Sequence, residues 1–192
     1  MTTFTIIGTG NMANAIGGVL ADGGSSVTYV AKHQVGVAPV DGDVVVLAVP
    51  FPAVDSILDA YADALAGKVV VDITNPLNFE TFDSLVVPAG SSAAAEIQAR
   101  IPSAHVLKAF NTNFAATLGA KKVGELTTTV LVAGDSAEAK ATLVAAVEAG
   151  GLEAIDAGAL ARAHELEAIG FAQLTLAVSE KIGWTGGFGI TR

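Results

Sequence analysis

The sequence predicts an α/β fold: a doubly wound parallel sheet with helices on both faces. Short apolar segments alternate with segments of helical periodicity along most of the chain. The run Val44–Val49 is apolar throughout, which indicates a strand covered on both faces, as in a parallel sheet. The 192 residues are 52% hydrophobic and 15% charged, a composition that suits one domain with a large buried core.

In the first half of the chain, glycine, proline and serine separate the predicted elements. Gly23 and Gly24 end the first helix, and Ser91 or Ser92 can cap the third. The second helix has apolar residues at helical spacing from Val54 to Leu65. In order, we expect a strand at Phe4–Ile7, a helix at Asn11–Ala21, strands at Ser25–Val30 and Asp43–Val49, a helix at Ala53–Leu65, a strand at Lys68–Ile73 and a helix at Ala93–Arg100.

The second half continues the alternation and ends in a long helix. We expect strands at His105–Ala109, Thr127–Ala133 and Leu152–Asp156, and helices at Ser136–Ala149 and from about Leu160 to Lys181. Ser136 stands at the N-cap position of its helix. Residues 1–158 are expected to form the sheet domain, and residues 159–192 a small helical extension packed on it.

Two connections depart from the usual alternation. Residues 31–42 are too few, and too rich in glycine and proline, for a full crossover helix. Residues 77–89 show no clear period and are expected to form a loop, which is long enough to be the wall of a site. We expect the standard strand order of such sheets, with a crevice above strands one and four. Loops after the strands converge there: Gly8–Met12, Ala31–His33, Val49–Phe51, Thr74–Pro76 and Phe110–Phe114.

The turn after the first strand carries the clearest functional signal. It reads Gly8-Thr9-Gly10-Asn11-Met12-Ala13, a GxGxxA pattern that follows a strand and opens a helix. Gly8 permits the tight bend, and Gly10 has no Cβ to keep a pyrophosphate from the backbone. The free N–H groups and the dipole of the helix start then attract an anion. This context predicts a dinucleotide-binding site.

The end of the second strand favours NADP over NAD. An NAD site has an acidic residue there to accept from the ribose hydroxyl, but this chain has Ala31-Lys32-His33. Lys32 can pair with a 2′-phosphate, and Thr9 can donate a further hydrogen bond. The alternative interpretation is that Lys32 is an ordinary solvated lysine.

The composition argues against several kinds of partner and several kinds of chemical site. The net charge of −9 disfavours nucleic-acid and anionic-membrane partners, which need a basic surface. The chain has no cysteine, so disulfides, thiolate nucleophiles and cysteine-bound metals are excluded, and isolated His105 and His164 predict no metal site. No signal peptide and no spanning segment are recognisable, so we expect a cytoplasmic protein.

Four motifs, in this order, resemble a known family. They are Gly8-Thr9-Gly10-Asn11-Met12, Asp72-Ile73-Thr74-Asn75-Pro76-Leu77, Val106-Leu107-Lys108-Ala109-Phe110-Asn111-Thr112 and Asp156-Ala157-Gly158-Ala159-Leu160. The chain resembles the coenzyme F420-dependent NADP oxidoreductases over nearly its whole length. It is also similar to the cytosolic oxidoreductase domain of six-transmembrane metalloreductases. The resemblance implies a Rossmann NADP-binding domain with a C-terminal helical extension, in a homodimer.

The resemblance also implies a set of site residues. The pyrophosphate would lie at Thr9, Gly10, Asn11 and Met12, after Gly8. The 2′-phosphate would face Ala31, Lys32 and His33, and the adenine would face Val49 and Pro50. Asn75, Pro76 and Asn111–Ala115 would surround the nicotinamide and the second ring. The chain departs from the family at Ala31-Lys32, where Ser-Arg is usual, and at Asn113-Phe114, where Ile-Pro is usual.

Hydride transfer fits a site without acid–base machinery, because it needs mainly geometry and the exclusion of water. The expected catalytic segment is Asn111, Thr112, Asn113 and Phe114, in which the amides orient a ring edge. The alternative roles are loop capping for the two asparagines and core packing for Phe114. Lys108 is expected to reach the rim of the sheet, and Glu165 and Glu167 to lie on a solvated helix face. Trp184 and Phe188 either close the site or pack on the long helix.

Three functions remain open at this level. The first is hydride transfer between NADPH and a flavin-like acceptor such as coenzyme F420. The second is NADPH-dependent reduction of FMN, FAD or a small carbonyl or imine compound. The third is a non-catalytic NADPH-binding sensor module.

The segment Ala168–Val178 is apolar almost all round, so it must be covered on more than one side. We therefore expect a homodimer built on this helix. The alternative is that the glycine-rich tail folds back and covers the second face within one chain.

Overall fold

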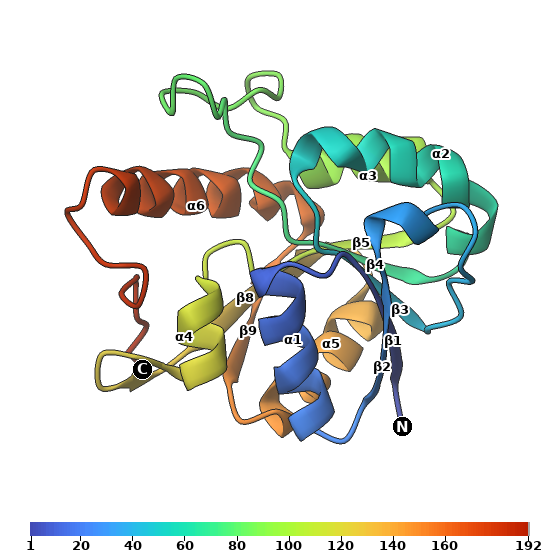
Figure 1. Cartoon of the computed structure of the whole chain (residues 1–192), viewed down its shortest axis with the longest axis horizontal. Helices are drawn as coiled ribbons and strands as arrows, with labels where there is room; N and C mark the ends of the chain where they lie inside the picture. Colours follow the sequence, from blue (N-terminus) through green and yellow to red (C-terminus); the bar gives the residue numbers. More distant parts are fainter. Residues whose placement is uncertain (192) are drawn as a thin grey trace.

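A seven-stranded sheet forms the centre of the computed structural model, which describes residues 1–191 (Figure 1). Its strands are β1 (Thr3–Ile7), β2 (Ser26–Val30), β3 (Val44–Leu47), β4 (Val69–Asp72), β5 (His105–Lys108), β8 (Thr129–Gly134) and β9 (Glu153–Gly158). Their order across the sheet is β2-β1-β3-β4-β5-β8-β9. A small separate hairpin pairs β6 (Lys122–Val123) with β7 (Leu126–Thr127). The predicted α/β class is confirmed.

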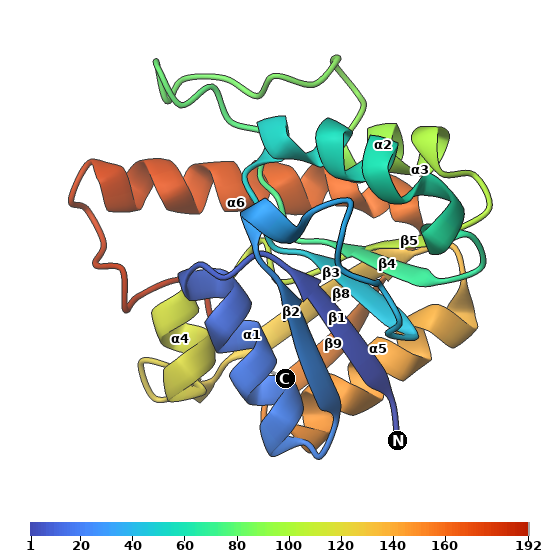
Figure 2. The same cartoon turned by 45° about the vertical axis from the view of Figure 1, so that its right-hand side comes forward.

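Helices cover both faces of the sheet (Figure 2). They are α1 (Asn11–Asp22), α2 (Val54–Leu65), α3 (Ala93–Arg100), α4 (Ala115–Ala120), α5 (Ala137–Ala149) and α6 (Ala163–Val178), with short 3₁₀ turns η1 (Lys32–Gln34), η2 (Phe51–Ala53) and η3 (Leu160–Arg162). As predicted, Ser92 and Ser136 accept N-cap hydrogen bonds. The short α4 and the β6–β7 hairpin were not predicted. Within residues 1–191, no helix is long and apolar enough to cross a membrane.

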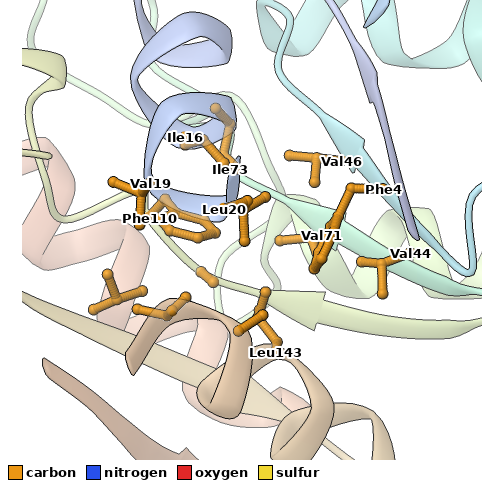
Figure 3. Close-up of a cluster of buried hydrophobic side chains, with 14 of the residues drawn as sticks. Phe4, Ile16, Val19, Leu20, Val44, Val46, Val71, Ile73, Phe110 and Leu143 are labelled. Carbon is orange, nitrogen blue, oxygen red and sulfur yellow. The ribbon is translucent and has the colours of Figure 1, made fainter. Parts of the chain in front are cut away.

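Alternating side chains of the strands form two cores, one on each face. Phe4, Val44 and Val71 belong to the cluster under α1 and α5. Figure 3 shows Leu20 of α1 and Leu143 of α5 beside them. The residues between these, such as Val45, point to the opposite face and pack under α2 and α3. Because both faces are covered, β3 is apolar throughout, as the sequence suggested.

The sheet is not wholly parallel, which corrects the predicted all-parallel arrangement. Strands β1 to β5 run parallel, but β8 runs antiparallel to β5, with Leu107 opposite Gly134. The connection between them contains only the 6-residue α4 and the β6–β7 hairpin, so no long helix carries the chain back along the sheet to begin a parallel strand. The chain therefore stays at the edge where β5 ends, and Asn113 Nδ2 donates to the carbonyl oxygen of Thr129 at the start of β8 (3.0 Å).

The predicted strand order is also wrong in one respect. The third strand along the chain, β3, lies directly beside β1, and no strand of the described residues 1–191 lies outside β2. As expected, the link between β2 and β3 has no crossover helix and contains only η1. The order reverses between β1 and β3, and a crevice is expected above this point.

Candidate functional site

The glycine-rich turn joins β1 to α1 at the point where the strand order reverses. Gly8 has a φ of 127°, and a Cβ there would collide with the carbonyl oxygen of Ala48. Gly10 has a φ of −77°, and a Cβ there would meet nothing within 4 Å. The turn itself therefore requires Gly8, whereas Gly10 leaves open space above the start of the helix.

The first turn of α1 is free to face an anion. The N–H of Asn14 donates to the carbonyl oxygen of Gly10 (3.0 Å), so the N–H groups of residues 11–13 precede the first helical hydrogen bond. Among residues 1–191 no side chain caps this end, and the first turn holds no acidic residue. Asn14 Nδ2 also donates to the carbonyl oxygen of Thr9 (3.2 Å) and ties the turn to the helix. The positive end of the helix dipole is thus open to a negatively charged group.

The segment after β2 lies beside this turn, because Ile7 and Val30 are neighbours in the sheet. Ala31 is the N-cap residue of η1, and its N–H donates to Gln34 Oε1 (2.9 Å). Lys32 and His33 follow with exposed side chains, and no acidic residue stands at this strand end. The edge therefore offers cationic or neutral groups, which suit a phosphate better than a ribose diol.

Two asparagines join the loops that follow β4 and β5. Asn75 Nδ2 donates to the carbonyl oxygen of Asn111 (2.8 Å), and Asn111 Nδ2 donates to Asn75 Oδ1 (2.9 Å) and to the carbonyl oxygen of Leu166 (2.8 Å). Gly170 of α6 allows this close packing, because a Cβ there would collide with Asn75 Oδ1. Phe110, at the start of the second loop, is fully buried with a φ of 61°, a conformation that neighbouring contacts must hold.

The Oδ1 atoms of Asn111 and Asn113 are buried and have no hydrogen-bond partner among the described residues. Buried acceptors are normally paired, so an orphaned pair beside a cavity fits a ligand that brings N–H donors. The amide nitrogens of both asparagines bind backbone carbonyls and hold the loop, which is the capping role that the sequence offered as the alternative. Ligand orientation by the two oxygens stays a prediction.

A hollow of about 390 Å³ lies between the start of α1, these two loops and the chain after α6. It is lined by Asn11, Met12, Ile73, Asn75, Phe110, Asn111, Asn113, Phe114, Ala115, Ala116, Leu174 and Trp184. None of these side chains is ionisable. The hollow therefore suits a neutral, flat group that is recognised by amides.

Not all predicted residues meet in this hollow. Thr112 lines a separate apolar groove with Thr129 and Ala168. Val49 and Pro50 follow β3 along the same sheet edge, and Pro76 is buried after β4. Leu174 was not predicted, because its position depends on how α6 packs.

A buried ion network stands behind the two loops. Lys108 Nζ lies 2.8 Å from Asp72 Oδ2 and 2.7 Å from Glu167 Oε1, and all three side chains are fully buried. Lys108 also donates to the carbonyl oxygen of Thr74. The expectations that Lys108 reaches the rim and that Glu167 is solvated are therefore wrong. Glu165 is exposed, as expected.

The register of the sheet explains this network. Asp72 and Lys108 are direct neighbours on β4 and β5, and both point to the α6 side. Glu167 reaches them from α6, and its Oε2 accepts from the N–H of Ala93 at the start of α3 (3.0 Å). Burial raises the pKa of Glu167, and the charge of Lys108 opposes that rise. The network fixes the strand ends that carry Asn75 and Asn111.

A family model and a curated relative both connect this chain with F420-dependent NADP oxidoreductases. Residues 31–76 match the model of the family described as NADP oxidoreductase coenzyme F420-dependent. The chain is 31% identical to the F420-dependent NADP reductase of Methanocaldococcus jannaschii over 150 residues, which are 76% of this chain and 67% of the relative.

Two further relatives extend this picture. Metalloreductase STEAP3 of Rattus norvegicus is 32% identical over 178 residues, and the match covers 85% of this chain but 35% of that protein. The chain thus spans about a third of the length of the metalloreductase. Among solved structures, a candidate F420-dependent NADP reductase from Arthrobacter sp. FB24 superposes with a TM-score of 0.85 at 25% identity and covers 100% of both chains.

Proposed function

The chain belongs to the F420-dependent NADP oxidoreductase family, and from this premise we propose that it transfers a hydride between NADPH and a flavin-like acceptor such as coenzyme F420. The observation that carries the proposal is the hollow beside the glycine-rich turn. Amides, aromatic rings and aliphatic side chains line it, with no ionisable side chain among them, and such a lining suits a hydride transfer between two flat rings.

The residues of this edge fit an NADP molecule. The open space at Gly10 and the free N–H groups of residues 11–13 would hold the pyrophosphate, with Thr9 and Met12 beside them. Lys32, with Ala31 and His33, would face the 2′-phosphate. Val49 and Pro50 would line the adenine side.

In this reaction the protein has to position the two rings, and no side chain has to donate or accept a proton. Bound NADPH would supply the hydride, a proton with two electrons, and reduction of the acceptor ring would take up one further proton from solvent. Asn75, Pro76 and Asn111–Ala115 would hold the two rings in contact and exclude water. The unpaired Oδ1 atoms of Asn111 and Asn113 would accept from the carboxamide or from an N–H of the acceptor ring.

The test is the oxidation of NADPH, followed by its absorbance, after addition of coenzyme F420, FMN or FAD under anaerobic conditions. Rapid oxidation with F420 supports the proposal. Oxidation only with FMN or FAD, or in a parallel assay only with carbonyl or imine compounds, would move the protein to the second function that the sequence left open. Tight NADPH binding without turnover of any acceptor would favour a sensor module.

A further inference from the structure

The single tryptophan of the chain stands at the mouth of the hollow, in the segment that follows α6. This segment reverses direction at Glu180, which has a φ of 59°, and the N–H of Lys181 donates back to the carbonyl oxygen of Leu176 (2.9 Å). A second turn follows, in which the N–H of Gly186 donates to the carbonyl oxygen of Gly183 (2.9 Å). Trp184 therefore projects from a hydrogen-bonded turn.

One buried side chain ties this turn to the loop after β5. Gln173 of α6 is 2% exposed, and its Nε2 donates to the carbonyl oxygen of Thr112 (3.1 Å). Its Oε1 accepts from the N–H of Phe188 (3.1 Å). Figure 1 shows the chain after α6 turning back toward α4, which follows that loop. The position of Trp184 is thus coupled to that of the loop that contains Asn111 and Asn113.

One side of the Trp184 indole packs against the ring of Phe114, and the rest of the indole is exposed. The two ring centroids lie 5.0 Å apart, and the planes are tilted by 55°. Phe114 is 7% exposed, whereas Trp184 is 53% exposed. An exposed tryptophan that is held in place at the wall of a cavity offers a flat surface of large area for an aromatic ligand.

We propose that Trp184 determines the specificity of the acceptor side, by stacking its open face against a planar aromatic acceptor. The inference rests on the proposed function, because it takes the hollow to be the place of hydride transfer. One of the unpaired Oδ1 atoms of Asn111 and Asn113 would then accept from an N–H at the edge of that acceptor, and the other from the nicotinamide carboxamide. A flat ring with an N–H at its edge, such as an oxidised flavin or deazaflavin, satisfies both features, and an aliphatic carbonyl compound satisfies neither.

The experiment compares four proteins: wild type, Trp184→Ala, Trp184→Phe and Phe188→Ala. Phe188 is the matched control, because it lies in the same segment with 52% exposure but lines the other groove. Each protein is saturated with NADP⁺, which cannot donate a hydride, and is titrated with coenzyme F420 and with FMN. Binding is read from the fluorescence of the added ring, and KM and kcat are then measured with NADPH.

Trp184→Ala should raise both the Kd and the KM for the acceptor about tenfold, the usual effect of losing one stacked ring. Trp184→Phe should retain most of the affinity, and Phe188→Ala should match the wild type. The Kd for NADPH should stay the same in all four proteins. An acceptor Kd unchanged in Trp184→Ala would overturn the inference, and so would a lowered Kd, which would mean that the indole blocks the hollow.

The two readouts separate this inference from the proposed function. Binding of F420 or FMN that depends on Trp184, without turnover, would support the stacking role and contradict the hydride transfer. Turnover with the same KM in wild type and Trp184→Ala would support the hydride transfer and contradict the stacking role. If neither compound binds to the wild-type protein, both are wrong.

Discussion

Replacing Gly10 by valine should abolish dinucleotide binding while the fold survives. The backbone at Gly10 has a φ of −77°, which valine adopts without strain, and a Cβ there meets nothing within 4 Å. The added methyl groups would occupy the space above α1 that we assign to the pyrophosphate. Hydrogen bonds to a charged group contribute about 1.5–3 kcal/mol each. Loss of two such bonds would cost about 3–6 kcal/mol, which weakens binding roughly a hundredfold to more than ten-thousandfold.

Two other glycines serve as controls in the same assay. Gly18 lies further along α1 and also has open space, so Gly18→Val should bind NADPH like the wild type. Gly8→Val should fail to fold, because its φ of 127° is wrong for valine and the side chain would collide with Ala48. Calorimetry gives the Kd, and thermal unfolding by circular dichroism checks the fold. A folded Gly10→Val protein with the wild-type Kd would refute the assignment of the turn.

Three further predictions concern specificity, stability and assembly. Lys32→Ala should weaken NADPH binding about tenfold to a hundredfold and leave NADH binding unchanged; equal affinities of the wild type for the two cofactors would contradict it. Burial raises the pKa of Glu167 in the folded protein above 4.5, so this residue contributes stability in its protonated form. That contribution is lost as the pH rises through the raised pKa. The wild type's lead over Glu167→Gln in the free energy of urea unfolding should therefore narrow as the pH rises above about 4.5 and through the raised pKa, and a constant difference would be evidence against this. The side chains of Ile169, Leu176 and Val178 of α6 are exposed, and we propose that they pack against the same residues of a second chain in a homodimer. Light scattering should then give a mass twice the 19.2 kDa of one chain. A mass near 19.2 kDa would contradict the dimer and favour the alternative, in which the C-terminal tail covers this face of α6.

Features fixed by local sequence were predictable. The apolar run at Val44–Leu47 identified a doubly covered strand, and the pattern around Gly8 and Gly10 identified the strand–turn–helix unit. The small number of residues in 31–42 correctly excluded a crossover helix. In each case the residues that carry the sequence pattern are the same residues that form the structure, within a segment of about a dozen positions.

Features that depend on distant contacts were missed. The direction of β8 depends on the short α4, which has too few residues to show a helical period. The roles of Lys108 and Glu167 depend on strand register and on the packing of α6. A signal did exist, because a lysine in a buried strand needs a counter-ion, and Glu167 lies on the same face of α6 as buried Ala163 and Gly170.

A crystal structure of the protein with NADP⁺ and coenzyme F420 tests the central claim most directly. We predict the pyrophosphate over Gly10 and Asn11, the 2′-phosphate beside Lys32, and the nicotinamide in the hollow beside Asn111. The acceptor ring should lie against C4 of the nicotinamide. A dinucleotide bound at another edge of the sheet, or a nicotinamide that lies outside the hollow, would contradict the account.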